Sequence, residues 1–124
     1  MCGICGVYDL TGQGRTGLAA VRAMCAAIRH RGPDGDGFYA PSDQPNVAMG
    51  MRRLSIIDVA GSDQPLYNED RSIALVFNGE IYNYRELRRT LMQQEHTFRT
   101  EGDGETIIHL YEQHGLDLFA HLRG

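Results

Sequence analysis

Cys2 is the residue whose position points most directly to chemistry. If Met1 is removed, Cys2 carries both a thiol and a free α-amine. An α-amine has a pKa of about 7.7–8.0, so a useful fraction is neutral near pH 7. The amine can therefore act as the base for the thiol, directly or through one water, and a single residue supplies a nucleophile and its base. The alternative is a buried cysteine on an N-terminal strand.

Asn78, Gly79 and Glu80 form a second candidate site, because they directly follow the apolar segment 72–77. The side-chain amide of Asn78 and the backbone N–H of Gly79 could both point at one oxygen atom, as the stabilisation of an oxyanion requires. An ordinary Asn-Gly turn has the same sequence pattern. The segment alone leaves both interpretations open.

Cys2 and Cys5 have a Cys-x-x-Cys spacing that is also typical of metal and redox sites. On a strand, however, residues three apart point to opposite faces, and one pair supplies only half of a tetrahedral zinc shell. The histidines show no ligand spacing with another cysteine. The sequence therefore predicts no metal site, and it predicts that Cys5 and Cys25 are small buried residues. A redox or metal module is the alternative.

The composition is that of one globular domain spanning residues 1–124. Of the 124 residues, 42% are hydrophobic and 23% are charged, and the net charge is −4. A weakly acidic domain lacks the field that attracts nucleic acid or an anionic membrane. No apolar run approaches the ~20 residues that span a bilayer, and no signal peptide is visible. We therefore expect a cytoplasmic protein without nucleic-acid or membrane partners.

Alternating strands and helices must position these residues. Strands are expected at 3–9, 47–57, 72–77 and 97–100, and helices at 18–28, from Asn83, after Asp103 and at 116–122. Asn83 with Glu86 resembles a capping box, and Asp103, alone or with Thr100, can cap the following helix. Segments 31–37 and 59–70 are rich in turn residues and are expected to be loops. The fold class is α+β.

Six motifs occur in one order along nearly the whole chain. They are Met1 to Gly6, Arg29 to Asp34, Arg53 to Asp58, Gln64 to Asn68, Asn78 to Tyr84, and Thr100-x-x-Asp103-x-Glu105. Together they resemble the N-terminal glutaminase domain of glutamine-hydrolysing asparagine synthetases, which are class II glutamine amidotransferases. This resemblance implies that Cys2 attacks the side-chain amide of L-glutamine, while Asn78 and the Gly79 backbone hold the oxyanion.

The resemblance also implies how glutamine is held. Arg53 would bind the α-carboxylate, because a guanidinium fork fits a carboxylate with two parallel bonds, and Arg52 would be its solvated neighbour. Backbone contacts would come from the residues that follow, Leu54, Ser55, Ile56 and Ile57. Asp103, with Glu80, would accept hydrogen bonds from the ammonium. Gly104 departs from the family pattern and could loosen the loop that carries Asp103.

The fold implied by the resemblance is the N-terminal-nucleophile hydrolase sandwich, with two sheets between helical layers. The family continues beyond position 124 into further strands and an ATP-dependent synthetase domain. We therefore expect an incomplete glutaminase domain that needs no cofactor, with ATP and Mg serving only the synthetase domain. Exposed strand edges make a homodimer one expected state. The alternatives are an amidotransferase with a different acceptor and a fragment without catalytic activity.

Overall fold

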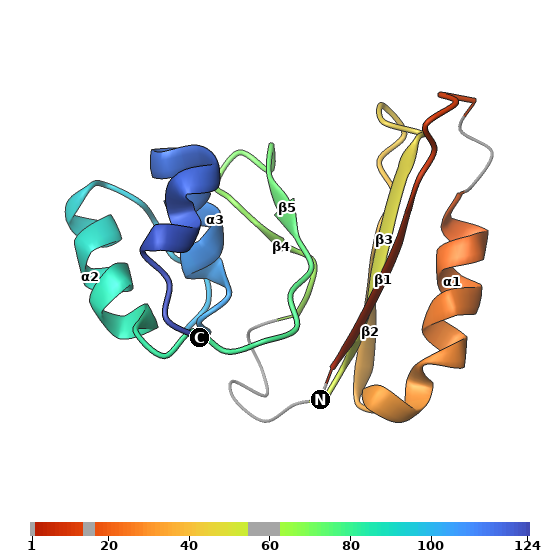
Figure 1. Cartoon of the computed structure of the whole chain (residues 1–124), viewed down its shortest axis with the longest axis horizontal. Helices are drawn as coiled ribbons and strands as arrows, with labels where there is room; N and C mark the ends of the chain where they lie inside the picture. The colour runs from red at the N-terminus through yellow and green to blue at the C-terminus, as the bar shows by residue number, and fades with distance from the viewer. Residues whose placement is uncertain (1, 14–16, 55–62) are drawn as a thin grey trace. The chain divides into compact units, whose positions relative to one another are not determined.

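The structure, a computed structural model, describes residues 2–13, 17–54 and 63–124. These residues form two compact units, which are described separately. The first unit comprises the described residues up to 54 together with 76–78, and the second comprises 63–75 and 79–124. Figure 1 shows the strands and helices of each unit. Both units combine strands with helices, which agrees with the predicted α+β class.

An antiparallel sheet with one covering helix makes up most of the first unit. Its strands are β1 (Gly3–Tyr8), β2 (Gly35–Tyr39) and β3 (Val47–Arg53), in the order β1-β3-β2. Helix α1 (Leu18–Ala27) lies along this sheet (Figure 1). The register pairs Gly3 with Arg52. The N-terminus of β1 therefore lies beside the C-terminal end of β3.

The contact between α1 and the sheet has a small core. Val21 and Cys25 of α1 are buried against Ala48 of β3. Gly50 allows α1 to approach this closely, because a Cβ at Gly50 would lie 2.6 Å from Val21 Cγ1 and 2.7 Å from Cys25 Sγ. The predicted strand at 3–9 and helix at 18–28 are confirmed within one residue.

Strand β2 is absent from the sequence prediction, which assigned residues 31–37 to a loop. A short 3-10 helix at Arg29–Arg31 follows α1, and β2 begins at Gly35. Gly32 is needed between them, because a Cβ there would collide with the backbone of Arg52 and Arg53. The segment becomes a strand through its pairing with β3 and not through local propensity.

The second unit packs helices and two short strands around a separate core. The elements are β4 (Leu66–Tyr67), β5 (Ala74–Leu75), α2 (Tyr84–Gln93), α3 (Glu105–His114) and a 3-10 helix at Gly115–Ala120. The buried leucines Leu91, Leu110 and Leu118 come from the three helical elements. The structure shortens the predicted strand at 72–77 to two residues, and it has no strand at 97–100.

Neither predicted helix cap makes its side-chain hydrogen bond, although Asn83 stands at the predicted N-cap position of α2. Asn83 does precede α2, but its side chain bonds the C-terminal segment: Nδ2 donates to the His121 carbonyl at 2.9 Å, and Oδ1 accepts from Arg123 N at 3.0 Å. Asp103 is likewise not the cap of α3, which follows Gly104, because its carboxylate accepts a hydrogen bond from Ile81 N. In both cases a tertiary hydrogen bond replaces the local one.

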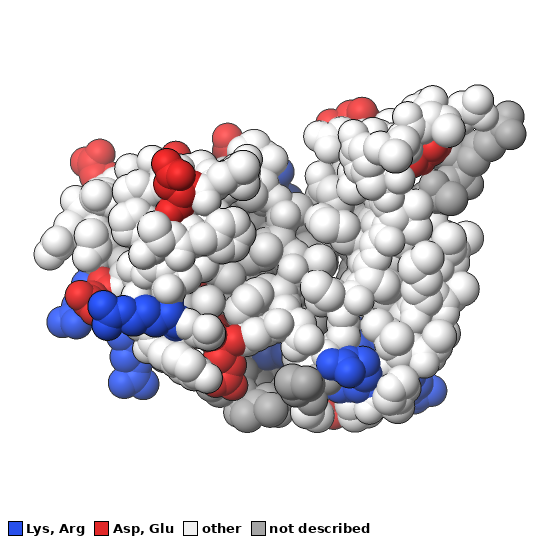
Figure 2. Space-filling view, in the orientation of Figure 1, with Lys and Arg blue, Asp and Glu red and all other residues white. Residues whose placement is uncertain are grey.

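Acidic and basic side chains are interspersed with uncharged ones on the face shown in Figure 2. None of the helices among the described residues combines the length and the apolar character that a membrane-spanning segment needs.

Candidate functional site

Cys2 lies directly before β1, and its thiol contacts the end of β3. The Sγ atom accepts a hydrogen bond from Leu54 N at 3.3 Å, and the thiol can donate to Leu54 O at 3.6 Å. The pairing of Gly3 with Arg52 places position 2 beside positions 53 and 54. Strand register therefore fixes the predicted nucleophile beside Arg53 and Leu54, the first two residues of the predicted glutamine-binding segment.

Arg31 also holds Cys2 in place. Its Nε atom donates a hydrogen bond to the Cys2 carbonyl at 3.2 Å. Gly3 provides the room, since a Cβ at Gly3 would lie 3.3 Å from Arg31 Cδ and 2.9 Å from Ile28 Cδ1. Arg31 is the first residue of the segment 31–37, which the sequence predicts to be a loop. No local signal could indicate this contact, because the two residues are 29 positions apart.

Arg52 and Arg53 are both buried at the end of β3. Arg52 donates from Nε to Gly32 O at 2.8 Å and from Nη2 to Pro33 O at 3.4 Å, and its Nη1 pairs with Asp36 at 2.8 Å. The prediction that Arg52 is a solvated neighbour is therefore wrong. The reason is the register, which places Asp36 of β2 opposite Arg52. Because all three nitrogen atoms of Arg52 are engaged, this residue is a poor candidate for a substrate carboxylate.

The other predicted site residues divide between the units. Asn78 is exposed and belongs to the first unit with Cys2 and Arg53, while Gly79, Glu80 and Asp103 belong to the second. Ser55, Ile56 and Ile57 lie outside the described residues.

Within the second unit, the segments that carry Glu80 and Asp103 are joined. Ile81 N donates to Asp103 Oδ2 at 2.7 Å, so the carboxylate of Asp103 lies beside the residue after Glu80. Thr106 N donates to the backbone oxygen of Asp103 at 3.1 Å. Gly104 has ordinary helical angles, with φ −62° and ψ −32°. The glycine is therefore accommodated as the first residue of the helical turn that fixes Asp103.

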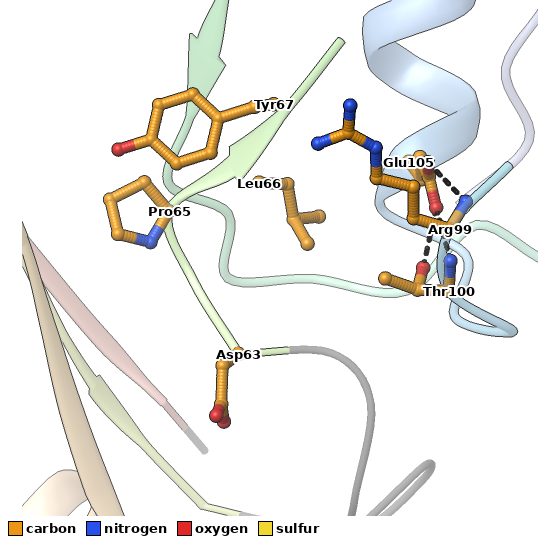
Figure 3. Close-up of a pocket in the computed structure, with 7 residues that line it drawn as sticks. All are labelled: Asp63, Pro65, Leu66, Tyr67, Arg99, Thr100 and Glu105. Carbon is orange, nitrogen blue, oxygen red and sulfur yellow. Dashed lines mark hydrogen bonds between the residues drawn. The ribbon is translucent and has the colours of Figure 1, made fainter. Parts of the chain in front are cut away.

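A pocket of about 220 Å³ lies in the second unit (Figure 3). Its lining residues, none of which is a predicted glutamine-binding residue, are Asp63, Pro65, Leu66, Tyr67, Arg99, Thr100 and Glu105. The Glu105 carboxylate accepts bonds from Arg99 N and Thr100 N, both at 2.8 Å, and from Thr100 Oγ1 at 2.7 Å. Burial would raise the pKa of Glu105, but the neighbouring His109 ring and the hydrogen bonds from Arg99 and Thr100 lower this pKa to about 2. The carboxylate of Glu105 therefore fixes the loop before α3, because both of its oxygen atoms accept hydrogen bonds from Arg99 and Thr100.

Comparison with known families identifies the chain. The family described as glutamine amidotransferase domain matches this chain over residues 1–124, its full length. The chain belongs to this family. It is 43% identical over its full length to asparagine synthetase [glutamine-hydrolyzing] 1 of Arabidopsis thaliana, and 44% identical over its full length to the asparagine synthetase [glutamine-hydrolyzing] of Asparagus officinalis. The chain spans about 20% of the length of each of these relatives.

The other two thiols of this glutamine amidotransferase domain face each other. Cys5 Sγ lies 3.4 Å from Cys25 Sγ, on the side of β1 that packs against α1. Cys25 is buried, as predicted, whereas Cys5 is only half-buried. Burial is the largest cause that raises the pKa of Cys25 to about 12, followed by the hydrogen bond with Cys5. The thiols of Cys2 and Cys5 have different partners, which agrees with their expected orientation on opposite faces.

We expect Cys25 of the glutamine amidotransferase domain to resist alkylation at pH 8. With a pKa of about 12, only about one thiol in 10⁴ is the reactive thiolate at that pH. Treatment of the folded protein with iodoacetamide, followed by peptide mass spectrometry, should leave Cys25 unmodified, and the same treatment in urea should modify it fully. Equal alkylation rates of Cys25 in the two conditions would contradict the buried, protonated thiol.

Proposed function

We propose that this chain is a glutaminase that hydrolyses L-glutamine to glutamate and ammonia, with Cys2 as the nucleophile. The observation that carries the proposal is the hydrogen bond from Leu54 N to Cys2 Sγ at 3.3 Å. This bond holds a thiol beside Arg53, the residue with the chemistry to bind the substrate carboxylate. Membership in the glutamine amidotransferase domain family supports the same reaction.

The reaction needs Cys2 at the N-terminus, after loss of Met1. The α-amine takes the thiol proton, and the sulfur attacks the side-chain amide carbon of glutamine. The amide of Asn78 and the N–H of Gly79 stabilise the oxyanion. Protonation of the amide nitrogen and cleavage of the C–N bond release ammonia and leave a thioester on Cys2. Water then attacks the thioester, which yields glutamate and restores the thiol.

Arg53 binds the α-carboxylate of glutamine in this proposal, and Asp103 with Glu80 binds the α-ammonium. Leu54 and the segment Ser55 to Ile57 provide the backbone contacts. Arg52 has a structural role, because its three side-chain nitrogen atoms bind Gly32, Pro33 and Asp36. The assignment of Arg53 follows from its place in the motif that resembles the family, directly before Leu54, Ser55 and Ile56. A site that binds both the α-carboxylate and the α-ammonium of glutamine rejects simple amides, because its own charged side chains would then be buried without a partner, which costs free energy.

The proposal extends to the fold and to the whole protein. The chain would be part of an N-terminal-nucleophile αββα sandwich in the cytoplasm. A synthetase domain that uses ATP and Mg would accept the ammonia and form asparagine, as the names of the relatives suggest for those proteins. Similarity to asparagine synthetases favours this function over the two alternatives, which are an amidotransferase with a different acceptor and a fragment without catalytic activity.

Two measurements on one sample test the glutaminase proposal. Intact mass spectrometry reports whether Met1 has been removed, and an assay of glutamate release reports the hydrolysis. The proposal expects processed protein that releases glutamate from glutamine and not from simple amides. Processed, folded protein without glutamate release would overturn it.

Arg53→Lys should raise the KM for glutamine by roughly 10-fold, because lysine keeps the charge and loses the bidentate fork. The measurement is KM in the glutamate-release assay. Arg52→Lys is the comparison: it removes bonds to Gly32 and Pro33, so it should lower the Tm more than it changes KM. If Arg52→Lys raises KM and Arg53→Lys does not, the carboxylate ligand is the other arginine.

A further inference from the structure

Two histidines and two glutamates, none of them a predicted glutamine-binding residue, lie close together in the second unit. Glu69 follows β4, His96 follows α2, and His109 and Glu112 lie one turn apart on α3. One nitrogen or oxygen atom from each residue can be chosen so that the four atoms lie within 4.8 Å of one another. His109 is fully buried (0% exposed), while Glu69 and Glu112 are exposed. The cluster therefore joins a buried ligand to solvent-accessible ones.

The spacing of the four residues matches a small metal coordination shell. Ligands at about 2.0–2.1 Å from a tetrahedral zinc ion lie about 3.3 Å from one another. The Nδ1 atom of His109 lies 2.9 Å from Glu112 Oε2 and 3.7 Å from Glu69 Oε2. The Nδ1 atom of His96 lies 3.4 Å from Glu112 Oε2 and 3.8 Å from Glu69 Oε1. Glu112 Oε2 therefore lies near both histidines, while Glu69 offers a different oxygen to each histidine, and the four separations lie on both sides of the tetrahedral value.

The two histidines also have partners for their other ring nitrogens. His109 Nε2 is buried, makes no hydrogen bond and lies 3.7 Å from Glu105 Oε1. With a metal on Nδ1, the proton must be on Nε2, where it faces that carboxylate, an arrangement common around metal-bound histidines. His96 Nε2 lies 2.7 Å from the Gln113 side-chain amide, which can present its oxygen there. Each ring is therefore supported with Nδ1 facing the cluster.

The two glutamates are oriented by hydrogen bonds as well. Thr97 N donates to Glu69 Oε1 at 2.9 Å. Asn68 Nδ2 donates to Glu112 Oε1 at 2.8 Å, which leaves Oε2 facing both histidines. Such contacts fix the ligands before a metal binds and reduce the entropy lost on binding.

The charge of the cluster favours a divalent cation. Three carboxylates, those of Glu69, Glu105 and Glu112, surround the two imidazoles. With neutral histidines this gives three negative charges, one of them on a nearly fully buried residue. The site therefore attracts positive charge to the position between the ligands.

We propose that Glu69, His96, His109 and Glu112 form a structural zinc site. Two imidazole and two carboxylate ligands suit Zn²⁺, whereas Mg²⁺ and Ca²⁺ prefer oxygen ligands alone. Four protein ligands leave no open position for a substrate, as in structural zinc sites. The ion would tie the segments after β4 and after α2 to α3, and so stabilise the second unit. This role is additional to the proposed glutaminase reaction and does not depend on it.

The test is zinc binding by the purified protein, measured after chelator treatment by competition with a chromogenic zinc indicator. Wild-type protein should bind one Zn²⁺ per chain, and zinc should raise its Tm. Co²⁺ in its place should give the intense visible absorption of a tetrahedral site. His96→Gln and Glu112→Gln should each weaken zinc binding by roughly 10-fold or more, with loss of the cobalt spectrum.

Two histidine variants outside the cluster serve as controls. His30→Gln changes a histidine of the first unit, and His121→Gln changes a ring that stacks on His114 at 4.2 Å between centroids. Both should bind zinc like the wild type. The proposal is overturned if folded wild-type protein binds no zinc in a 1:1 ratio. It is also overturned if His96→Gln binds zinc as tightly as wild type, or if His121→Gln is the variant that loses binding.

Discussion

Cys2→Ala should abolish glutamine hydrolysis, with a loss of roughly 10⁴-fold or more in kcat. Removal of a catalytic nucleophile has costs of this order or larger in enzymes that act through a covalent intermediate. The α-amine remains in the variant, but it has no thiol to deprotonate, and no thioester can form. The measurement is glutamate release under saturating glutamine.

The matched control for this variant is Cys5→Ala. The Cys5 thiol lies beside Cys25 Sγ and Val21 O on the side of β1 that packs on α1, whereas Leu54 and Arg31 bond to Cys2. Hydrolysis should therefore persist in Cys5→Ala, and circular dichroism should show that both variants fold. Activity of Cys2→Ala equal to that of Cys5→Ala would remove Cys2 from the mechanism.

Asn78→Ala should lower kcat for glutamine hydrolysis by about 10²–10³, the usual cost of losing one oxyanion donor. The KM should change little, because the bond from the Asn78 amide is strongest when the carbonyl oxygen carries its negative charge. Steady-state kinetics of glutamate release separates the two parameters. A change confined to KM would place Asn78 in substrate binding.

Asn46→Ala is a suitable control for the Asn78 variant. Asn46 precedes β3 and accepts a hydrogen bond from Asp9 N through its backbone oxygen, at 2.7 Å, which alanine retains. The variant removes a similar amide from the same unit without altering that bond. Its kinetic constants should equal those of the wild type.

The elements that follow from a local pattern were predictable. The apolar spacing of α1 and the short segment of strand-forming residues in β1 depend only on neighbouring residues, and both elements lie within one residue of their expected bounds. Strand β2 was not predictable in this way, because Gly35 and Gly37 favour a loop until β3 is beside them. Asn83 stands at the N-cap position of α2 as predicted, but its side chain does not bond the helix, because it bonds residues near the C-terminus, about 40 positions away.

The candidate site likewise has features that the local sequence predicts and features that depend on long-range contacts. The position of Cys2 after Met1 and the Asn78-Gly79 pair are visible in the sequence itself, and the six motifs point to the family. The support from Arg31 and the burial of Arg52 depend on long-range backbone contacts and could not be predicted. The Glu69, His96, His109 and Glu112 cluster gives still less signal, because only His109 and Glu112 share an element.

Covalent trapping with a diazo-ketone analogue of glutamine tests the central claim most directly. The Cys2 thiolate would displace N₂ from the analogue and form a stable thioether at the position of the thioester. Intact mass and peptide mapping of the treated protein should show one adduct, on Cys2 of a chain that has lost Met1, and free glutamine should slow its formation. An adduct on Cys5 or Cys25, or unmodified Cys2 in protein that hydrolyses glutamine, would contradict the assignment of Cys2 as the nucleophile.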